Sequence, residues 1–328
     1  MFPSFDYVRP TSLQAAIRQL SDPGAVVHAG GTDLLGCLRE RIFTIRKVVS
    51  ISALKELHGI AAGADGSLRI GALATVHSVA EHPLVRNRFG GLAQAASEVA
   101  SPQLRHQGTI GGNICQKPRC WYYRGDFNCL RKGGGTCFAL DGENQFHCIF
   151  GGGGTCFIVH PSDTAPMLVA LRATARVAGP GGLREVPLEK FYVLPEVDVQ
   201  RETVLGPREI VTEIRIPPPA AGTRTAYRKV RARGSWDFAL AGVALALRFD
   251  GRRVADGRVV LSGAAPVPWR SAAAEQAIRG RELDAKVIAD AAQAAVAGAE
   301  PLEKNGYKIA LFQGVMEEEL TRMSRLAT

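Results

Sequence analysis

The segment VVHAGGTDLL, residues 26–35, joins an apolar run to a helix start through two glycines. It predicts a buried strand, a tight turn at Gly30 and Gly31, and a helix that begins at Thr32 or Asp33. Glycines let backbone N–H groups approach a phosphate closely, and the positive end of a helix favours negative charge. The spacing is neither G-x-G-x-x-G nor that of a P-loop with its lysine. The segment therefore indicates a phosphate site of another kind, with a turn that binds no ligand as the competing interpretation.

Two later segments carry polar residues suited to the same ligand. GTIGGN at residues 108–113 is a second glycine-rich turn, with Thr109 and Asn113 as side-chain donors. HPSDTAP at residues 160–166 places Asp163 just before an expected helix, where a carboxylate suits either a helix N-cap or the ribityl and ribose hydroxyls of a nucleotide. Two glycine-rich turns in one domain suit a pyrophosphate that is held from both sides.

The pattern of apolar residues predicts an α+β fold. The chain has 328 residues and 46% hydrophobic content, enough for two or three domains. Helix and strand patterns are mixed in the first part, which includes a helix expected within residues 83–101. After the proline-rich segment RIPPPAAG, strand patterns alternate and three helices follow. We therefore expect one domain over residues 1–218 and a second over residues 223–328.

The charge distribution argues against nucleic-acid binding. Lys and Arg number 40 against 31 Asp and Glu, and the excess is spread along the chain without a dense basic run. No apolar run reaches the roughly 18 residues that span a bilayer. The first residues lack the basic and apolar regions of a signal peptide. We expect a protein with no membrane span, located in the cytoplasm.

Six of the seven cysteines lie in one glycine-rich stretch with little helix or strand pattern. The steps between Cys120, Cys129, Cys137 and Cys156 are 9, 8 and 19 residues, unlike the C-x₂-C pairs of structural zinc sites. A [4Fe–4S] cluster needs four converging thiolates, which a long loop can supply. A cluster is the leading hypothesis on this chemistry. Zinc and, in an exported protein, disulfides stay open.

Four motifs occur in the order and spacing of one protein family over nearly the whole chain: AGGTDLL, SPQLRHQGTIGGNI, HPSDTAP and YRKVRARGSWDFAL. In these motifs the chain resembles the FAD-binding medium subunit of the xanthine oxidase family of molybdenum hydroxylases. The resemblance implies a two-part FAD-binding domain of the PCMH or vanillyl-alcohol-oxidase-like type. An α+β domain similar to the C-terminal domain of CO dehydrogenase flavoproteins would follow it.

Most members of that family join the second and third motifs by a short link, whereas this chain has a loop inserted over residues 114–157. Members of the aldehyde oxidoreductase type hold a [4Fe–4S] cluster in such a loop, and the β subunit of 4-hydroxybenzoyl-CoA reductase is similar. By this resemblance the metal ligands are Cys120, Cys129, Cys137 and Cys156. Cys115 and Cys148 fall where the pattern has no ligand, although His147 keeps another ligand set open. Cys37 is expected in the core.

The resemblance also implies which residues hold FAD. The first glycine segment would wrap the pyrophosphate and the second would close the other side. Asp163 would contact the ribityl region. Lys229 would lie near the isoalloxazine ring, where a cation stabilises the anionic reduced flavin, or else be an exposed strand lysine. Tyr227 and Trp236 are candidates to pack beside the flavin, with core burial as the alternative. The expected FAD-binding set is Val26, Val27, His28, Ala29, Gly30, Gly31, Thr32, Asp33, Leu34, Thr109, Gly112, Asn113, Asp163 and Lys229.

The implied function is electron transfer within a heteromeric oxidoreductase. Substrate would be oxidised at a molybdopterin cofactor in a large partner subunit. Electrons would cross two [2Fe–2S] clusters in a small partner, reach FAD in this chain and pass to an external acceptor. No catalytic residue is expected here. The rival interpretations are a subunit like that of 4-hydroxybenzoyl-CoA reductase, a stand-alone FAD oxidase and a non-catalytic zinc-binding module. Because the aldehyde oxidoreductase type includes a complex exported in a folded state, the periplasm is the alternative location.

Overall fold

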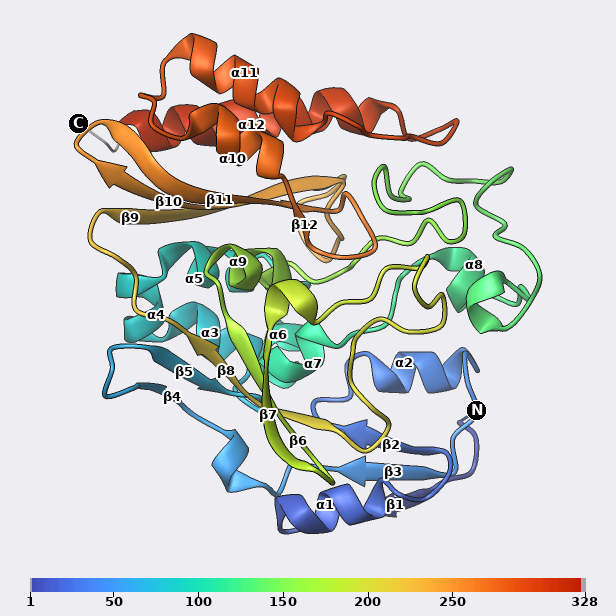
Figure 1. Ribbon diagram of the computed structural model, residues 1–328. Helices are drawn as coiled ribbons and strands as arrows, with labels where there is room; N and C mark the ends of the chain where they lie inside the picture. Colours follow the sequence, from blue (N-terminus) through green and yellow to red (C-terminus); the bar gives the residue numbers. More distant parts are fainter. Residues whose placement is uncertain (1, 326–328) are drawn as a thin grey trace.

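The first glycine segment follows the edge strand of a small parallel sheet (Figure 1). The computed structural model describes residues 2–325. The strands lie in the order β1, β3, β2, and Val26 pairs with Val48 across the β2–β3 ladder. Helix α1 packs on one face of this sheet through Ala16, and α2 packs on the other through Leu38. The bounds are β1 Asp6–Val8, α1 Leu13–Gln19, β2 Ala25–His28, α2 Leu34–Arg39 and β3 Lys47–Ser50.

A five-stranded antiparallel sheet and a group of short helices complete this half of the molecule. The strand order is β4, β5, β8, β6, β7, so β8 lies in the centre although it comes last along the chain. Phe89, Leu92 and Leu168 are fully buried in the core between this sheet and the helices. The strands are β4 Ile60–Ala62, β5 Leu68–Gly71, β6 Thr174–Gly179, β7 Gly182–Pro187 and β8 Ile210–Ile216. The helices are α3 Val76–Glu81, α4 Pro83–Arg88, α5 Gly90–Ser97, α6 Pro102–Gln107, α7 Ile110–Ile114 and α9 Thr164–Ala170.

Beyond the proline-rich segment the chain forms a second antiparallel sheet, in the order β12, β11, β10, β9. Successive side chains of a strand point to opposite faces, so Ala244 faces the core shared with α5 and α9, whereas Leu245 packs under the C-terminal helices. The sheet is therefore the middle layer between two groups of helices (Figure 1). Its elements are β9 Thr223–Val230, β10 Ala241–Asp250, β11 Arg253–Ser262, β12 Trp269–Arg270, α10 Ala272–Ile278, α11 Ala285–Ala295 and α12 Tyr307–Arg325. None of the helices between residues 2 and 325 combines the length and the apolar character that crossing a bilayer requires.

Between α7 and α9 the chain forms a long irregular segment, drawn in green at one side of the molecule (Figure 1). Its regular elements within the described chain are α8 Trp121–Arg124 and the 3₁₀ turn η2 Leu130–Lys132. Lys308 of α12 holds the later part of the segment, because its Nζ donates to the carbonyl of His147 at 3.0 Å and to that of Gly263, beside β11, at 2.8 Å. Burial of this ammonium lowers the pKa of Lys308 to about 8. The segment is thus fixed by contacts with regular elements rather than by secondary structure of its own.

The prediction of one helix within residues 83–101 is wrong in its extent. Two helices, α4 and α5, meet at Phe89, where φ of −137° and ψ of 49° interrupt the helical backbone. The second helix ends at Ser97. Phe89 is fully buried, so the break is stabilised by the packing of its ring, which helical periodicity does not report.

The prediction of a turn at residues 108–113 is also wrong, because residues 110–114 form helix α7. Thr109 caps this helix: its hydroxyl accepts from the N–H of Gly112 at 3.2 Å. Glycines disfavour a helix by about 1 kcal/mol each relative to alanine. Ile110 and Ile114 are fully buried on one side of α7, and this packing outweighs the low helix propensity.

Truncation in the shared sheet is expected to destabilise the whole chain. Leu245→Ala removes a fully buried side chain, and we expect the free energy of unfolding to fall by about 2–5 kcal/mol. Leu183→Ala removes a leucine that is 58% exposed, so its expected effect stays within about 0.5 kcal/mol. Urea unfolding followed by circular dichroism measures both. Equal losses in the two variants would contradict this layered arrangement.

Candidate cofactor site

The turn after β2 presents a run of unused backbone donors. Within residues 2–325, the N–H groups of Gly30, Gly31, Thr32 and Asp33 donate to no protein acceptor. The same residues line a cavity of 270 Å³, here the first cavity. Backbone N–H groups require acceptors, and an oxyanion can serve several consecutive N–H groups at once. The turn can therefore hold a phosphate group through its backbone.

Glycine is required at two positions of this turn. A Cβ at position 30 would lie 2.1 Å from the carbonyl oxygen of Gln107, far inside van der Waals contact. Gly31 has φ of +74°, where a side chain crowds the following carbonyl oxygen. The Nε2 of Gln107 donates to the carbonyl of Gly30 at 3.0 Å. The first glycine segment therefore packs directly against the residue that precedes the second one.

The second segment has fewer free donors than the sequence predicts. The N–H of Gly112 is taken by the Thr109 hydroxyl, and the N–H of Asn113 donates to the Thr109 carbonyl at 2.8 Å. The side-chain oxygen of Asn113 accepts from the hydroxyls of Ser162 and Thr164 at 2.5 and 2.6 Å. The NH₂ group of Asn113 and the O–H of Thr109, which accepts but does not donate within the described chain, are left as side-chain donors of the segment. Asn113 thus connects the second segment to the third.

Two cavities meet between the glycine segments. A second cavity of 410 Å³ runs on towards Asp163 and Trp236. The residues that line both cavities are Thr32, Asp33, Thr109, Gly112 and Gln116. Thr32 and Asp33, whose N–H groups are free, lie where the two cavities meet. Two adjoining cavities with backbone donors at their junction suit a dinucleotide whose pyrophosphate lies at that junction.

All but two of the expected FAD-binding residues line this space. The expected residues that do line the two cavities are Val26, Val27, Ala29, Gly30, Gly31, Thr32, Asp33, Leu34, Thr109, Gly112, Asn113 and Asp163. His28 does not line either cavity and packs edge-on against Tyr7, with ring centroids 6.3 Å apart. Lys229 is the second exception.

Lys229 lies behind Asp163. Its side chain is fully buried, so it is no exposed strand lysine, and its Nζ is 2.8 Å from Asp163 Oδ2. Tyr227 donates its hydroxyl to the other carboxylate oxygen at 2.8 Å. Burial raises the pKa of Asp163, and the contacts with Lys229 and Tyr227 oppose that rise. Asp163 makes no cap hydrogen bond to α9. The pair therefore fixes a carboxylate on the cavity wall, while the position of Lys229 beside an isoalloxazine ring stays a prediction.

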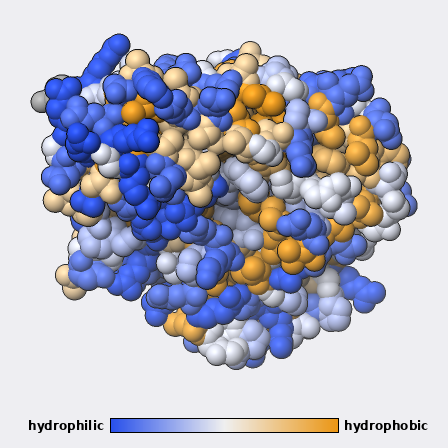
Figure 2. Space-filling model, turned by 45° about the horizontal axis from the view of Figure 1, so that its top comes forward, coloured by the Kyte–Doolittle hydropathy of each residue, from blue (hydrophilic) through white to orange (hydrophobic). Residues whose placement is uncertain are grey.

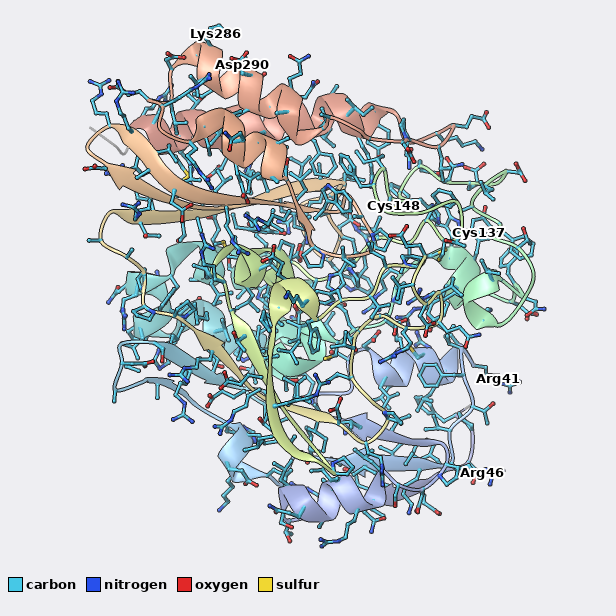
Figure 3. All side chains as sticks on the ribbon, in the orientation of Figure 1. Arg41, Arg46, Cys137, Cys148, Lys286 and Asp290 are labelled. Carbon is cyan, nitrogen blue, oxygen red and sulfur yellow. The ribbon has the colours of Figure 1, made fainter. Side chains whose placement is uncertain are left out.

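A chamber within the irregular segment is lined by the four cysteines that the resemblance names, Cys120, Cys129, Cys137 and Cys156. His147 shares its wall, whereas Cys115 and Cys148 do not. Cys115 lines the first cavity instead, as does the buried Cys37. All seven cysteines are free thiols. Figure 3 shows Cys137 further out in the segment than Cys148, which lies towards the C-terminal sheet.

The sulfur atoms of the chamber are in polar contact. Interaction between the Cys137 and Cys156 side chains lowers the pKa of Cys137 and raises that of Cys156. Cys120 Sγ lies 3.3 Å from Nε2 of His147, and burial lowers the pKa of this imidazole to about 4. No three His, Cys, Asp or Glu side chains of residues 2–325 are arranged to hold one metal ion. A [4Fe–4S] cluster has a different requirement, since each of its four thiolates binds a separate iron.

Comparison with protein families identifies both halves of the chain. Residues 3–219 match the FAD binding domain in molybdopterin dehydrogenase, and residues 225–319 match the CO dehydrogenase flavoprotein C-terminal domain. The chain belongs to the FAD-binding medium subunits of the xanthine oxidase family. The predicted fold class and the predicted binding of FAD are thereby confirmed. The chain is a subunit of a multi-subunit oxidoreductase.

Individual relatives match over almost their full length. The FAD-binding subunit of Escherichia coli aldehyde oxidoreductase is 36% identical over 97% of both chains. The carbon monoxide dehydrogenase medium chain of Hydrogenophaga pseudoflava is 30% identical over 92% of this chain and 89% of its own. A solved structure of carbon monoxide dehydrogenase from that organism superposes with a TM-score of 0.77 at 29% identity, over 97% of this chain and 96% of that chain. Quinoline 2-oxidoreductase from Pseudomonas putida 86 shares the fold, with a TM-score of 0.78 at 24% identity over 100% and 99%.

Sequence reasoning missed the basic residues of the second cavity. Arg119 and Arg124 line it and were not expected there. Arg119 directly precedes Cys120 and Arg124 lies four residues after it, and their charge beside an expected metal ligand is the signal that marks them. Of the two aromatic candidates, Tyr227 is fully buried, whereas Trp236 lines the second cavity with 63% of its surface exposed.

A side chain at position 30 is expected to weaken FAD binding. In Gly30→Ala the added methyl group overlaps the carbonyl of Gln107 and pushes the free N–H groups out of place. We expect the dissociation constant of FAD to rise about ten-fold or more, which is ~1.4 kcal/mol. Equilibrium dialysis of the apoprotein against FAD measures it. Gly181→Ala, where a Cβ meets no atom within 4 Å, should bind like the wild type. Unchanged affinity in Gly30→Ala would contradict the role of this turn.

Removing one member of the buried ion pair is expected to cost more than removing both charges. Lys229→Met leaves the Asp163 carboxylate buried without its cation, which we expect to lower the free energy of unfolding by about 3–5 kcal/mol. The double variant Asp163→Asn with Lys229→Met should recover part of that loss. Urea unfolding of the single and double variants tests this. Additive losses would show that the two side chains act independently.

Proposed function

We propose that this chain is the FAD- and [4Fe–4S]-containing electron-transfer subunit of a heteromeric molybdenum hydroxylase. The observation that carries the proposal is the cysteine chamber next to the cavities of the glycine segments. A third cavity of 160 Å³ shares Arg119 and Pro161 with the second cavity, and Cys120 and His147 with the chamber. Two redox centres held in these places would be neighbours.

The groups of this chain are suited to bind and orient FAD. The N–H groups of Gly30, Gly31 and Thr32 would bind the pyrophosphate, as negative charge is favoured by converging backbone dipoles. Asp163 would accept hydrogen bonds from ribityl hydroxyls, held in place by its contacts with Tyr227 and Lys229. When bound, FAD supplies redox chemistry that accepts one or two electrons.

The chamber is suited to a [4Fe–4S] cluster through the four thiols Cys120, Cys129, Cys137 and Cys156. The ring of Tyr122 packs near those of Phe138 and His147, with centroids 6.0 and 6.1 Å apart. These rings shield the sulfur atoms from water, and solvent exclusion is one of the factors that set a cluster's potential. A cluster held there supplies a one-electron centre.

We assign substrate oxidation to a large partner subunit with a molybdopterin cofactor, and the supply of electrons to a small partner with two [2Fe–2S] clusters. Relatives described as an FAD-binding subunit and a medium chain support this division.

Trp236 and Phe238 line the second cavity and are 63% and 46% exposed, so they offer a contact surface beside it. Figure 2 shows hydrophobic groups separated by hydrophilic surface on one face of the molecule. An external acceptor would take the electrons from this chain.

Cofactor content is the decisive measurement. For anaerobically purified full-length protein we expect about four irons, four acid-labile sulfides and one FAD per chain. Visible spectra before and after dithionite report both centres. FAD without iron would leave a plain flavin subunit, and zinc in place of iron would turn the chamber into a structural metal site.

Single substitutions test the ligand set. Replacing any one of the four chamber cysteines by Ser is expected to remove most of the iron, since each supplies one thiolate. Cys148→Ser changes a buried cysteine that does not line the chamber, and it should keep the iron. Iron lost in Cys148→Ser but kept in a chamber variant would favour a different ligand set that includes Cys148.

A further inference from the structure

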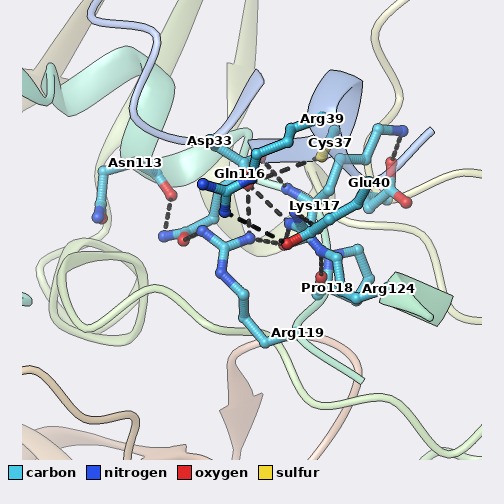
Figure 4. Close-up of polar contacts among 11 residues, drawn as sticks. Asp33, Cys37, Arg39, Glu40, Asn113, Gln116, Lys117, Pro118, Arg119 and Arg124 are labelled. Atoms are coloured by element: carbon cyan, nitrogen blue, oxygen red, sulfur yellow. Dashed lines mark hydrogen bonds and ion pairs between the residues drawn. The ribbon is translucent and has the colours of Figure 1, made fainter. Parts of the chain in front are cut away.

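The loop over residues 114–157, which holds six of the seven cysteines, is here called the cysteine segment. The carboxylate of Asp33 joins the first glycine segment to its start (Figure 4). Its Oδ2 accepts from the N–H of Lys117 at 2.7 Å. Its Oδ1 accepts from Arg119 and Arg124 at 2.6 and 2.7 Å. These partners are 84 to 91 positions away along the chain. One side chain thus connects two segments that line different candidate cofactor sites.

These contacts are partly shielded from water. The side chain of Asp33 is 20% exposed, and those of Arg119 and Arg124 are 27% and 13% exposed. Burial raises the pKa of Asp33, but the two arginine charges and the N–H of Lys117 outweigh it and lower the pKa below its usual value. A charged carboxylate can accept from two guanidinium groups and a backbone N–H together. A neutral amide, with one acceptor oxygen, cannot replace it.

The network reaches both sites. Asp33 makes no cap hydrogen bond to α2, so its carboxylate serves the cysteine segment while its backbone belongs to the glycine turn. Arg119 directly precedes Cys120, and Arg124 ends the helix that begins after Cys120. Arg119 lines the second and third cavities, and its guanidinium lies 5.4 Å from the ring centre of Phe238.

We propose that Asp33 is a positioning residue that couples the two cofactor sites, so that a filled cysteine chamber strengthens FAD binding. The inference rests on the proposed function. Ligation at Cys120 fixes the arginines on either side of it, and their contacts with Asp33 hold the turn whose N–H groups face the first cavity. A preordered turn binds its ligand with a smaller entropy loss. Linkage makes the coupling reciprocal: bound FAD strengthens metal retention by the same factor.

The test is a two-by-two measurement of FAD affinity on the full-length chain. The dissociation constant of FAD is determined by anaerobic equilibrium dialysis for iron-loaded protein and for protein from iron-limited cells, in the wild type and in Asp33→Asn. We expect iron to tighten FAD binding about five-fold or more in the wild type, a typical coupling, and less than about two-fold in Asp33→Asn. Glu81→Gln removes an exposed carboxylate that pairs with Arg86 at 3.0 Å and lines neither the cysteine chamber nor the two cavities. This matched control should keep the wild-type ratio.

The outcomes separate this inference from the proposed function. A wild-type chain that takes up no iron contradicts the proposed cluster itself. A wild-type chain that holds iron and FAD but shows no effect of iron on FAD affinity overturns only the coupling, as does an unchanged ratio in Asp33→Asn. If Asp33→Asn fails to fold by circular dichroism, the double variant Arg119→Gln with Arg124→Gln replaces it, because it removes both guanidinium contacts while Asp33 keeps the N–H of Lys117. A wild-type ratio in that double variant would equally overturn the coupling.

Discussion

The approach of Gly30 to the carbonyl group of Gln107 is the constraint on which the site depends. No room exists for a Cβ at this contact, so the turn after β2 and the end of α6 meet backbone to backbone. The cavities open on either side of the contact. The distance is set by how the small parallel sheet lies against the helical layer. The phosphate site is therefore a property of two packed segments rather than of one loop.

The C-terminal sheet completes the site from the other side. Tyr227 and Lys229 are two residues apart on β9, so their side chains share one face. On that face of the sheet β9 packs on α5, and β10 and β11 pack on α9, which brings the lysine onto Asp163 at the start of α9. The same layer that gives the two halves a common core thus fixes the carboxylate of the second cavity. Core packing and site geometry cannot be changed separately here.

The cysteine segment depends on its surroundings for order. Ordering an irregular chain costs conformational entropy that local hydrogen bonds do not recover. The segment is anchored at its start by Asp33 and at its end by Lys308 and Asn305, whose side chains bond to the carbonyls of residues 146–148. Metal ligation would add to these anchors, since binding to a site formed only in the folded chain stabilises folding.

Local sequence determined the elements around the first turn, because an apolar run, two glycines and a following helix leave few alternatives. It also determined which residue types were available for a metal. Tertiary structure decided where helical patterns broke, as at Phe89, and which side chains met. Asp33 and Asp163 both occupy N-cap positions, yet neither caps its helix. Each pairs with cations 66 to 91 positions away. Such pairings depend on how the layers pack. The apolar periodicity of one segment carries no information about which distant residue will lie beside it.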